Sequence, residues 1–99
     1  MMFKILYHHL VVRDDIPALP AVWKKKIRRA IELKLATRPD VYGKPLRSSL
    51  KNYRKLRVGD YRVIFRIEGD AVKILVILHR SAVYSIAEKR VERGLPSQS

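Results

Sequence analysis

Several features on which many proteins depend are absent from this sequence. No cysteine occurs among its 99 residues, which excludes disulfides and thiolate metal sites and fits a reducing compartment. The sequence has no glycine-rich phosphate-binding loop, and its longest apolar run, residues 74–78, is far shorter than the ~20 residues needed to cross a bilayer. The first ten residues are too short and too polar for a signal peptide. We therefore expect a soluble, cytoplasmic protein that forms one domain over residues 1–99.

Acidic residues are also scarce relative to basic ones. The chain has 22 Lys+Arg against 9 Asp+Glu, which gives a formal net charge of +13. Such a charge on a small domain attracts phosphate backbones or anionic membranes. The cations are spread through segments that look folded, which favours a structured binding surface over a disordered arm. Carboxylates are few, and the adjacent His8 and His9 should point to opposite faces of a strand, so we expect no metal site.

The hydrophobic pattern predicts four strands. They cover residues 3–7, 53–58, 61–67 and 72–79. Gly-Asp pairs at 59–60 and 69–70 are turn signals between the last three strands, which should therefore form consecutive antiparallel hairpins. The strand over 72–79 is apolar at nearly every position, so we expect it to be covered on both faces.

Helices are predicted on either side of the three-strand meander. Asp14 or Asp15 should cap a first helical segment, which Pro17 and Pro20 interrupt. Apolar residues at spacing four, beginning with Trp23 as a core anchor, predict an amphipathic helix over 21–35. Residues 41–52 should form a loop. A short last helix over 81–93 should end at 94–96, with a frayed end beyond it. The order of elements predicts an α+β fold: a small antiparallel sheet, made of the N-terminal strand and the meander, with two N-terminal helices on one face and a short C-terminal helix.

Two of the predicted strands carry cations on one face. These cations are Lys55 and Arg57 in one strand and Arg62 and Arg66 in the next. Because side chains alternate along a strand, each pair occupies one face. With Arg80, this cluster suits a phosphodiester, since guanidinium groups bind phosphate oxygens and stabilise charge that grows in a transition state. Crowding by other cations could leave Lys55 partly neutral and able to act as a base. The alternative is a solvated face whose cations serve solubility and edge protection.

Other side chains near this cluster could contribute to binding. Tyr84 follows Arg80 by one helical turn and offers a ring on which a base could stack. Such stacking contributes about 1–3 kcal/mol per base. The alternative is that Tyr84 packs at the rim of the core. His79 could act as an acid or base, or only hydrogen-bond at the sheet edge. The candidate RNA-binding cations are Lys44, Arg47 and Lys51 in the loop over 41–52, with Arg54, Arg57 and Arg66 on the strands. The basic run over 24–29 could touch an RNA backbone, or it is the wet face of the long helix.

Two segments resemble toxins of the RelE/ParE superfamily of toxin–antitoxin systems, on the RelE side. They are YRKLRVGDYRVIF at 53–65 and HRSAVY at 79–84, supported by IELKL at 31–35 and YGKPL at 42–46. The similarity runs over nearly the whole chain. It implies a RelE-like domain, since members of this superfamily are small cytoplasmic proteins with a compact α+β fold.

The resemblance also implies an activity. RelE-type toxins enter the ribosomal A site and cut mRNA there without a metal or other cofactor, by attack of a ribose 2′-hydroxyl on the adjacent phosphate. By the same resemblance, Lys55 matches a base or charge stabiliser, Arg62 the arginine that stabilises the phosphorane, and Arg80 a second phosphate-binding arginine. Tyr84 matches a tyrosine associated with stacking and orientation. The implied partners are a RelB-like antitoxin, the ribosome and its mRNA.

The sequence departs from the best-studied members of this superfamily at one position. They carry a second lysine two residues before the one matched by Lys55, where this chain has Tyr53. Arg54 could substitute for it, although a neighbouring strand position points to the opposite face. Two alternatives to the mRNA endonuclease stay open: a ParE-like toxin of the same fold that inhibits DNA gyrase, and a nucleic-acid-binding domain without catalysis.

Overall fold

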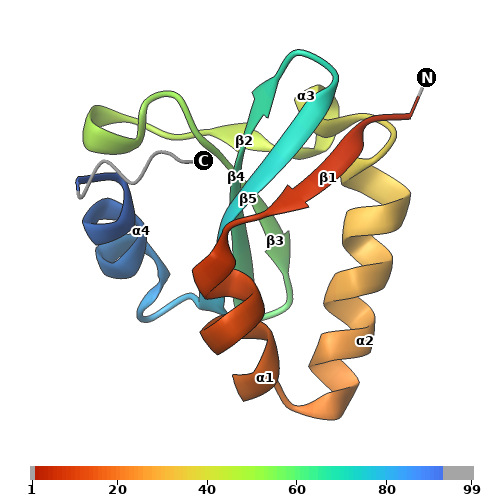
Figure 1. The fold of residues 1–99 in the computed structure, drawn as a ribbon, viewed down its shortest axis with the longest axis vertical. Helices are drawn as coiled ribbons and strands as arrows, with labels where there is room; N and C mark the ends of the chain where they lie inside the picture. The colour runs from red at the N-terminus through yellow and green to blue at the C-terminus, as the bar shows by residue number, and fades with distance from the viewer. Residues whose placement is uncertain (1, 93–99) are drawn as a thin grey trace.

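The computed structural model describes residues 2–92 and has an α+β fold built on a single five-stranded sheet (Figure 1). The strands are β1 (Lys4–Tyr7), β2 (Lys44–Pro45), β3 (Arg54–Val58), β4 (Tyr61–Glu68) and β5 (Ala71–His79). The helices are α1 (Ile16–Ala18), α2 (Ala21–Ala30), α3 (Pro39–Tyr42) and α4 (Val83–Glu92). Two π-helical turns, η1 (Val11–Asp15) and η2 (Ile31–Leu35), extend α1 and α2, and η3 (Ser48–Leu50) is a 3₁₀ turn. The α+β class and the predicted elements are confirmed, and the boundaries of the predicted strands shift by one residue at most.

The sheet has the strand order β1-β5-β4-β3-β2. The predicted meander is confirmed, because β3, β4 and β5 pair antiparallel through turns in which Gly59 and Gly69 have φ values of +61° and +62°. The prediction of a wholly antiparallel sheet is wrong, because β1 pairs parallel to β5. No tight turn joins β1 to its partner, so no local signal in the sequence sets the direction of this strand.

A fifth strand lies in the segment that was predicted to be a loop. The two residues of β2 pair antiparallel with the start of β3 and form the edge of the sheet. Such a short strand with a proline on its outer edge has little hydrophobic pattern to reveal it, and it also limits edge-to-edge pairing with other chains.

Helices cover both faces of the sheet, whereas the sequence predicted them on one face. In Figure 1, α2 lies on one side of the sheet and α4 on the other. The core under α2 includes Ile27, Ile31, Leu35, Leu56, Val63, Phe65, Val72, Ile74 and Ile77, and half-buried Trp23 packs against it as predicted. The core under α4 is made of Leu50, Ile64, Leu75, Val76, Val83 and Ala87. Strand β5 contributes to both cores and is covered on both faces, as its apolar sequence predicted.

The first helical segment begins earlier than predicted. Helical conformation starts at His9, so Asp14 and Asp15 lie inside the helix and neither side chain caps it. Asp15 is instead buried in an ion pair with Arg90 of α4. The predicted end of the C-terminal helix at 93–96 and the frayed residues after it lie outside the described residues. Within residues 2–92, no helix combines the length and the apolar character that a membrane span requires.

Candidate active site

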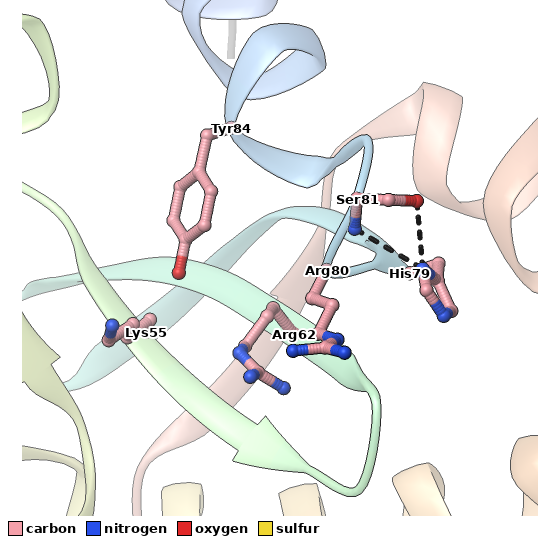
Figure 2. A pocket seen from close by; sticks show the side chains of 6 residues that line it. All are labelled: Lys55, Arg62, His79, Arg80, Ser81 and Tyr84. Atoms are coloured by element: carbon pink, nitrogen blue, oxygen red, sulfur yellow. Dashed lines mark hydrogen bonds between the residues drawn. The ribbon is translucent and has the colours of Figure 1, made fainter.

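An open hollow of about 440 Å³ lies where the β3–β4 hairpin and the end of β5 approach the start of α4. It is lined by Lys55, Arg62, His79, Arg80, Ser81 and Tyr84 (Figure 2). The four residues predicted to be catalytic are thus brought together, although they come from β3, β4, the end of β5 and α4. Tyr84 reaches down from α4 toward the strands, with Lys55 on one side of its ring and the two arginines on the other (Figure 2).

The pairing of β3 with β4 explains why these cations share a face. Lys55 lies opposite Ile64, and Arg57 lies opposite Arg62. Residues directly opposite one another in an antiparallel ladder project to the same side. Since Ile64 belongs to the core under α4, the cations project on that side too. The first turn of α4 then places Tyr84 above them.

Arg62 is held in place by backbone carbonyls. Its Nη1 donates hydrogen bonds to the carbonyl oxygens of Gly59 and Tyr61, both at 2.9 Å. A guanidinium has five N–H donors in a fixed fork, so these two bonds orient the group while Nε and Nη2 retain donors for a ligand. A cation fixed in this way is suited to bidentate recognition of phosphate.

Arg80 is positioned by the turn between β3 and β4. Its backbone N–H donates to the carbonyl of Asp60 at 2.8 Å, which ties the end of β5 to that turn. Its Nε lies 3.8 Å from an Asp60 carboxylate oxygen, and both side chains are mostly exposed. An exposed pair at this separation holds the guanidinium weakly, so an anionic ligand can compete for it.

Lys55 and Tyr84 face each other across the hollow. The ammonium Nζ of Lys55 lies 5.9 Å from the centroid of the Tyr84 ring, within the range of a cation–π contact. Both side chains are half-buried, and Tyr84 packs against the core under α4. No carboxylate within residues 2–92 forms an ion pair with Lys55, so its charge is open to an incoming anion.

His79 and Ser81 also line the hollow. The Ser81 backbone N–H donates to His79 Nδ1 at 3.2 Å, and the Ser81 hydroxyl lies 2.8 Å from the same nitrogen. Because a backbone N–H can only donate, Nδ1 acts as an acceptor and the proton of the neutral ring belongs on Nε2. The sequence had indicated His79 as a candidate acid or base. It had not indicated Ser81, whose only signal was its place directly after Arg80 at a strand end.

The predicted RNA-binding cations do not all lie at the hollow. Lys44 is opposite Lys55 in the β2–β3 pairing, and Arg57 is opposite Arg62, so both extend the same basic face. Exposed Arg47 and Lys51 flank η3, which contacts α4. We call Lys44, Arg47, Lys51 and Arg57 the outer cations.

Arg54 and Arg66 lie elsewhere. Arg54 is on the opposite face of β3, where its Nη1 donates to the carbonyls of Gly43 at 2.9 Å and Asp40 at 3.4 Å. Arg66 shares the face of Arg62 but sits farther along β4, with Nη2 3.1 Å from a Glu68 carboxylate oxygen. Its guanidinium also lies 5.9 Å from the centroid of the Tyr53 ring. Arg54 therefore serves the fold in this structure, and Arg66 is partly neutralised.

The chemistry open to this site is that of cations and hydrogen-bond donors. Lys55, Arg62 and Arg80 can bind a phosphate group and stabilise negative charge that develops on it. Tyr84 adds an aromatic surface, and His79 adds a titratable ring. Among residues 2–92, no group of three His, Asp or Glu side chains is arranged to hold a metal ion.

Comparison with protein families identifies the chain. Residues 3–84 match the model for the "ParE toxin of type II toxin-antitoxin system, parDE". The chain belongs to this toxin family. The structure has the RelE/ParE superfamily fold, which confirms the resemblance seen in the sequence.

Relatives within the superfamily are similar in sequence or in fold. The chain is 42% identical to Toxin RelE of Mycobacterium tuberculosis over 52 residues, which are 50% of this chain and 54% of that relative, so the match spans about half of its length. The toxin–antitoxin complex RelBE2 from the same organism has a chain with a TM-score of 0.74 at 28% identity, covering 82% of this chain and 94% of that one. A mutant of Escherichia coli toxin RelE in the free state shares the fold. Its TM-score is 0.72 at 14% identity, and the match covers 96% of this chain and 100% of that chain.

Proposed function

We propose that this toxin is a ribosome-dependent, metal-independent endoribonuclease that cuts mRNA in the ribosomal A site. The observation that carries the proposal is the convergence of Lys55, Arg62, Arg80 and Tyr84 on one open hollow. Three cations and one aromatic ring at that spacing suit a phosphodiester with a base beside it. The similarity to Toxin RelE supports the same activity.

Besides solvent water, the proposed reaction needs no group beyond those in the hollow and the message itself. The ribose 2′-oxygen passes its proton to Lys55 or to water and attacks the adjacent phosphorus. The bond from phosphorus to the 5′-oxygen breaks, and that oxygen takes a proton from water and leaves as a hydroxyl. The products are a 2′,3′-cyclic phosphate and a free 5′-hydroxyl. Lys55 accepts the proton or stabilises charge, while Arg62 and Arg80 stabilise the phosphorane.

Tyr84 and the outer cations orient the message in this proposal. A base next to the scissile phosphate stacks on the Tyr84 ring, and the backbone of the message contacts the outer cations Lys44, Arg47, Lys51 and Arg57. Such contacts do not depend on sequence. They leave the choice of codon to the ribosome and to the fit of the stacked base.

The proposed protein partner is a RelB-like antitoxin. Related structures with this fold are toxin–antitoxin complexes, including RelBE2 from Mycobacterium tuberculosis and RelB–RelE from Methanococcus jannaschii. An acidic or amphipathic antitoxin would neutralise the basic face around the hollow, and it could do so by displacing α4, which carries Tyr84. The toxin would then act in the cytoplasm once the antitoxin is lost.

Primer extension on a message in a translating extract tests the activity. Wild-type protein should produce cuts within codons, and Arg62→Ala should abolish them while the protein stays folded. Omitting ribosomes should also abolish them, whereas Arg38→Ala, which removes an exposed arginine outside the hollow, should cut normally. Cuts that persist in folded Arg62→Ala, or that need no ribosome, would contradict the proposed mechanism.

Inhibition of DNA gyrase is the second candidate, because the family model that matches the chain describes a ParE toxin. A gyrase inhibitor acts by protein contact, so it would not need Lys55, Arg62, Arg80 and Tyr84 to converge. A supercoiling assay with purified gyrase distinguishes the two activities. Inhibited supercoiling without cut message would favour this second candidate and count against the first.

A further inference from the structure

The outer face of α2 carries four cations that the proposed active site does not use. Lys24, Lys25, Arg28 and Arg29 are all exposed. Within residues 2–92, none of them forms an ion pair with a carboxylate, and α2 itself contains no acidic residue. We call these four residues the α2 basic face. Lys26 is not included, because its Nζ lies 4.9 Å from the centroid of the Trp23 ring.

The arrangement of these cations works against the stability of the helix. Lys24 and Arg28 are four residues apart, and so are Lys25 and Arg29. Like charges at this spacing lie on the same side of a helix and destabilise it by about 0.2–0.5 kcal/mol per pair. A face kept only for solubility would be better served by mixed charges. This pattern therefore favours a ligand that neutralises the cations.

Several cations elsewhere in the domain have acidic neighbours. Lys4 pairs with Asp70, Arg13 with Asp14, and Arg66 and Lys73 with Glu68. In the described chain, the cations without an acidic partner include the α2 basic face, Lys55 and Arg62 at the hollow, and single positions such as Arg38. The acidic residues are thus distributed in a way that leaves two strongly positive surfaces.

These two surfaces are on opposite sides of the sheet. The α2 core and the α4 core lie on its two faces, and Figure 1 shows α2 and α4 flanking the sheet. The Cα atoms extend no more than 31 Å along any principal axis. A domain of this size can touch one polyanion through the hollow and a second through α2 at the same time.

We propose that the α2 basic face binds the phosphate backbone of structured RNA while the hollow holds the message. The inference deepens the proposed function, on which it rests, and it assigns ribosomal RNA as the second ligand. Exposed, unpaired cations on a rigid helix suit phosphate contacts without base recognition. Contacts of this kind would hold the enzyme in the A site and help to make cleavage depend on the ribosome.

The test compares two variants with the same loss of charge. The first combines Lys24→Gln, Lys25→Gln, Arg28→Gln and Arg29→Gln. The control combines Lys4→Gln, Arg13→Gln, Arg38→Gln and Lys89→Gln, which are exposed and belong to neither surface. Both are made with Arg62→Ala, so that the message stays intact. Their affinities for purified ribosomes and for a 20-base-pair RNA duplex are measured over a range of salt concentrations.

The α2 variant should bind ribosomes at least about tenfold more weakly than the control, with a salt dependence that is less steep by roughly 0.7–0.9 per lost phosphate contact. An equal loss of ribosome affinity in the two variants would overturn the inference. So would a loss of antitoxin binding with ribosome binding unchanged, because the face would then serve a protein. If the protein with Arg62→Ala as its single substitution does not bind ribosomes, the affinities of the two variants for the RNA duplex are compared instead.

The proposed activity can fail separately from this inference. Wild-type protein that binds ribosomes through α2 but leaves the message uncut would contradict the endoribonuclease and leave RNA binding by α2 standing. The four α2 substitutions can also be made with Arg62 intact. If that protein cuts the message normally and binds ribosomes as the wild type does, only the role of α2 is overturned.

Discussion

Arg90 and Asp15 form a buried ion pair that joins the last described helix to the first. Two guanidinium nitrogens of Arg90 donate to the two Asp15 carboxylate oxygens, both at 2.9 Å. Arg90 also donates to the Leu75 carbonyl at 2.8 Å, and Asp15 accepts the Ile77 backbone N–H at 2.9 Å. Strand β1 pairs with β5 only as far as Ile74. The ion pair therefore satisfies backbone groups on the part of β5 that β1 leaves uncovered.

Breaking this pair should strongly destabilise the domain. Arg90→Met would leave the Asp15 carboxylate buried without its counter-ion, and removing one partner of a buried pair typically costs about 3–5 kcal/mol. Replacing both residues should not restore full stability, because Leu75 and Ile77 would keep unpaired backbone groups. Urea unfolding monitored by circular dichroism measures the change.

The neighbouring Arg13–Asp14 pair is a suitable control for that experiment. Arg13 Nε lies 2.8 Å from an Asp14 carboxylate oxygen, but both side chains are largely exposed. Arg13→Met should therefore change the urea midpoint little. Similar decreases of the urea midpoint in Arg13→Met and Arg90→Met would show that burial does not decide how much an ion pair contributes to stability.

Substitution of two glycines should separate backbone strain from crowding. Gly59 and Gly69 have nearly the same positive φ, but a Cβ on Gly59 would collide with the Trp23 ring, whereas a Cβ on Gly69 would meet no atom within 4 Å. Gly69→Ala should cost about 1–2 kcal/mol from the left-handed backbone alone. Gly59→Ala should cost clearly more, as measured by urea unfolding. Equal costs would mean that Trp23 moves away freely.

The sequence predicted the elements better than it predicted their arrangement. Hairpins over Gly59 and Gly69 depend on local turn chemistry, which can be read from neighbouring residues. The direction of β1 and the division of helices between the two faces depend on contacts between distant segments. The ion pair of Asp15 with Arg90 spans 75 residues, and a helix cap was the reasonable local interpretation of Asp15.

For the site, strand alternation was enough to group most of the cations. It placed Lys55 with Arg57 on one face of the first strand and Arg62 with Arg66 on one face of the second, and the register of β3 with β4 brings the two pairs to the same side. It could not show that Arg54 donates to backbone carbonyls around Gly43, because those partners lie in a segment that had no predicted structure. It also could not show Ser81 at the hollow, since a single serine after a strand carries no periodic signal.

His8 should make the stability of the domain depend on pH. Burial lowers the pKa of His8, the neighbouring His9 and Arg90 lower it further, and Asp15 opposes them. Its folded pKa is therefore below its unfolded value of about 6.5. Between the two values the unfolded chain binds more protons, so stability should rise with pH through this window and be lost as pH falls below about 6.5.

The matched variant for this pH dependence is His8→Asn. Asparagine keeps an acceptor for the Leu10 backbone N–H, which His8 Nδ1 accepts at 3.1 Å, but it does not titrate. Urea midpoints between pH 5 and pH 8 should therefore fall less steeply on acidification in the variant than in the wild type. Curves that stay parallel would show that His8 contributes nothing to the pH dependence.

Tyr84 should contribute to cleavage through its ring. Tyr84→Phe keeps the aromatic surface beside Lys55 Nζ, which lies 5.9 Å from the ring centroid, and should retain most of the cleavage rate in the translating extract. Tyr84→Ala should lose about 1–3 kcal/mol of stacking, which corresponds to a rate reduced about 5- to 150-fold. Since the ring packs on the core under α4, the unfolding curve of each variant must be measured beside its rate. If folded Tyr84→Phe is as slow as Tyr84→Ala, the hydroxyl takes part in the reaction and stacking is not the main contribution of this residue.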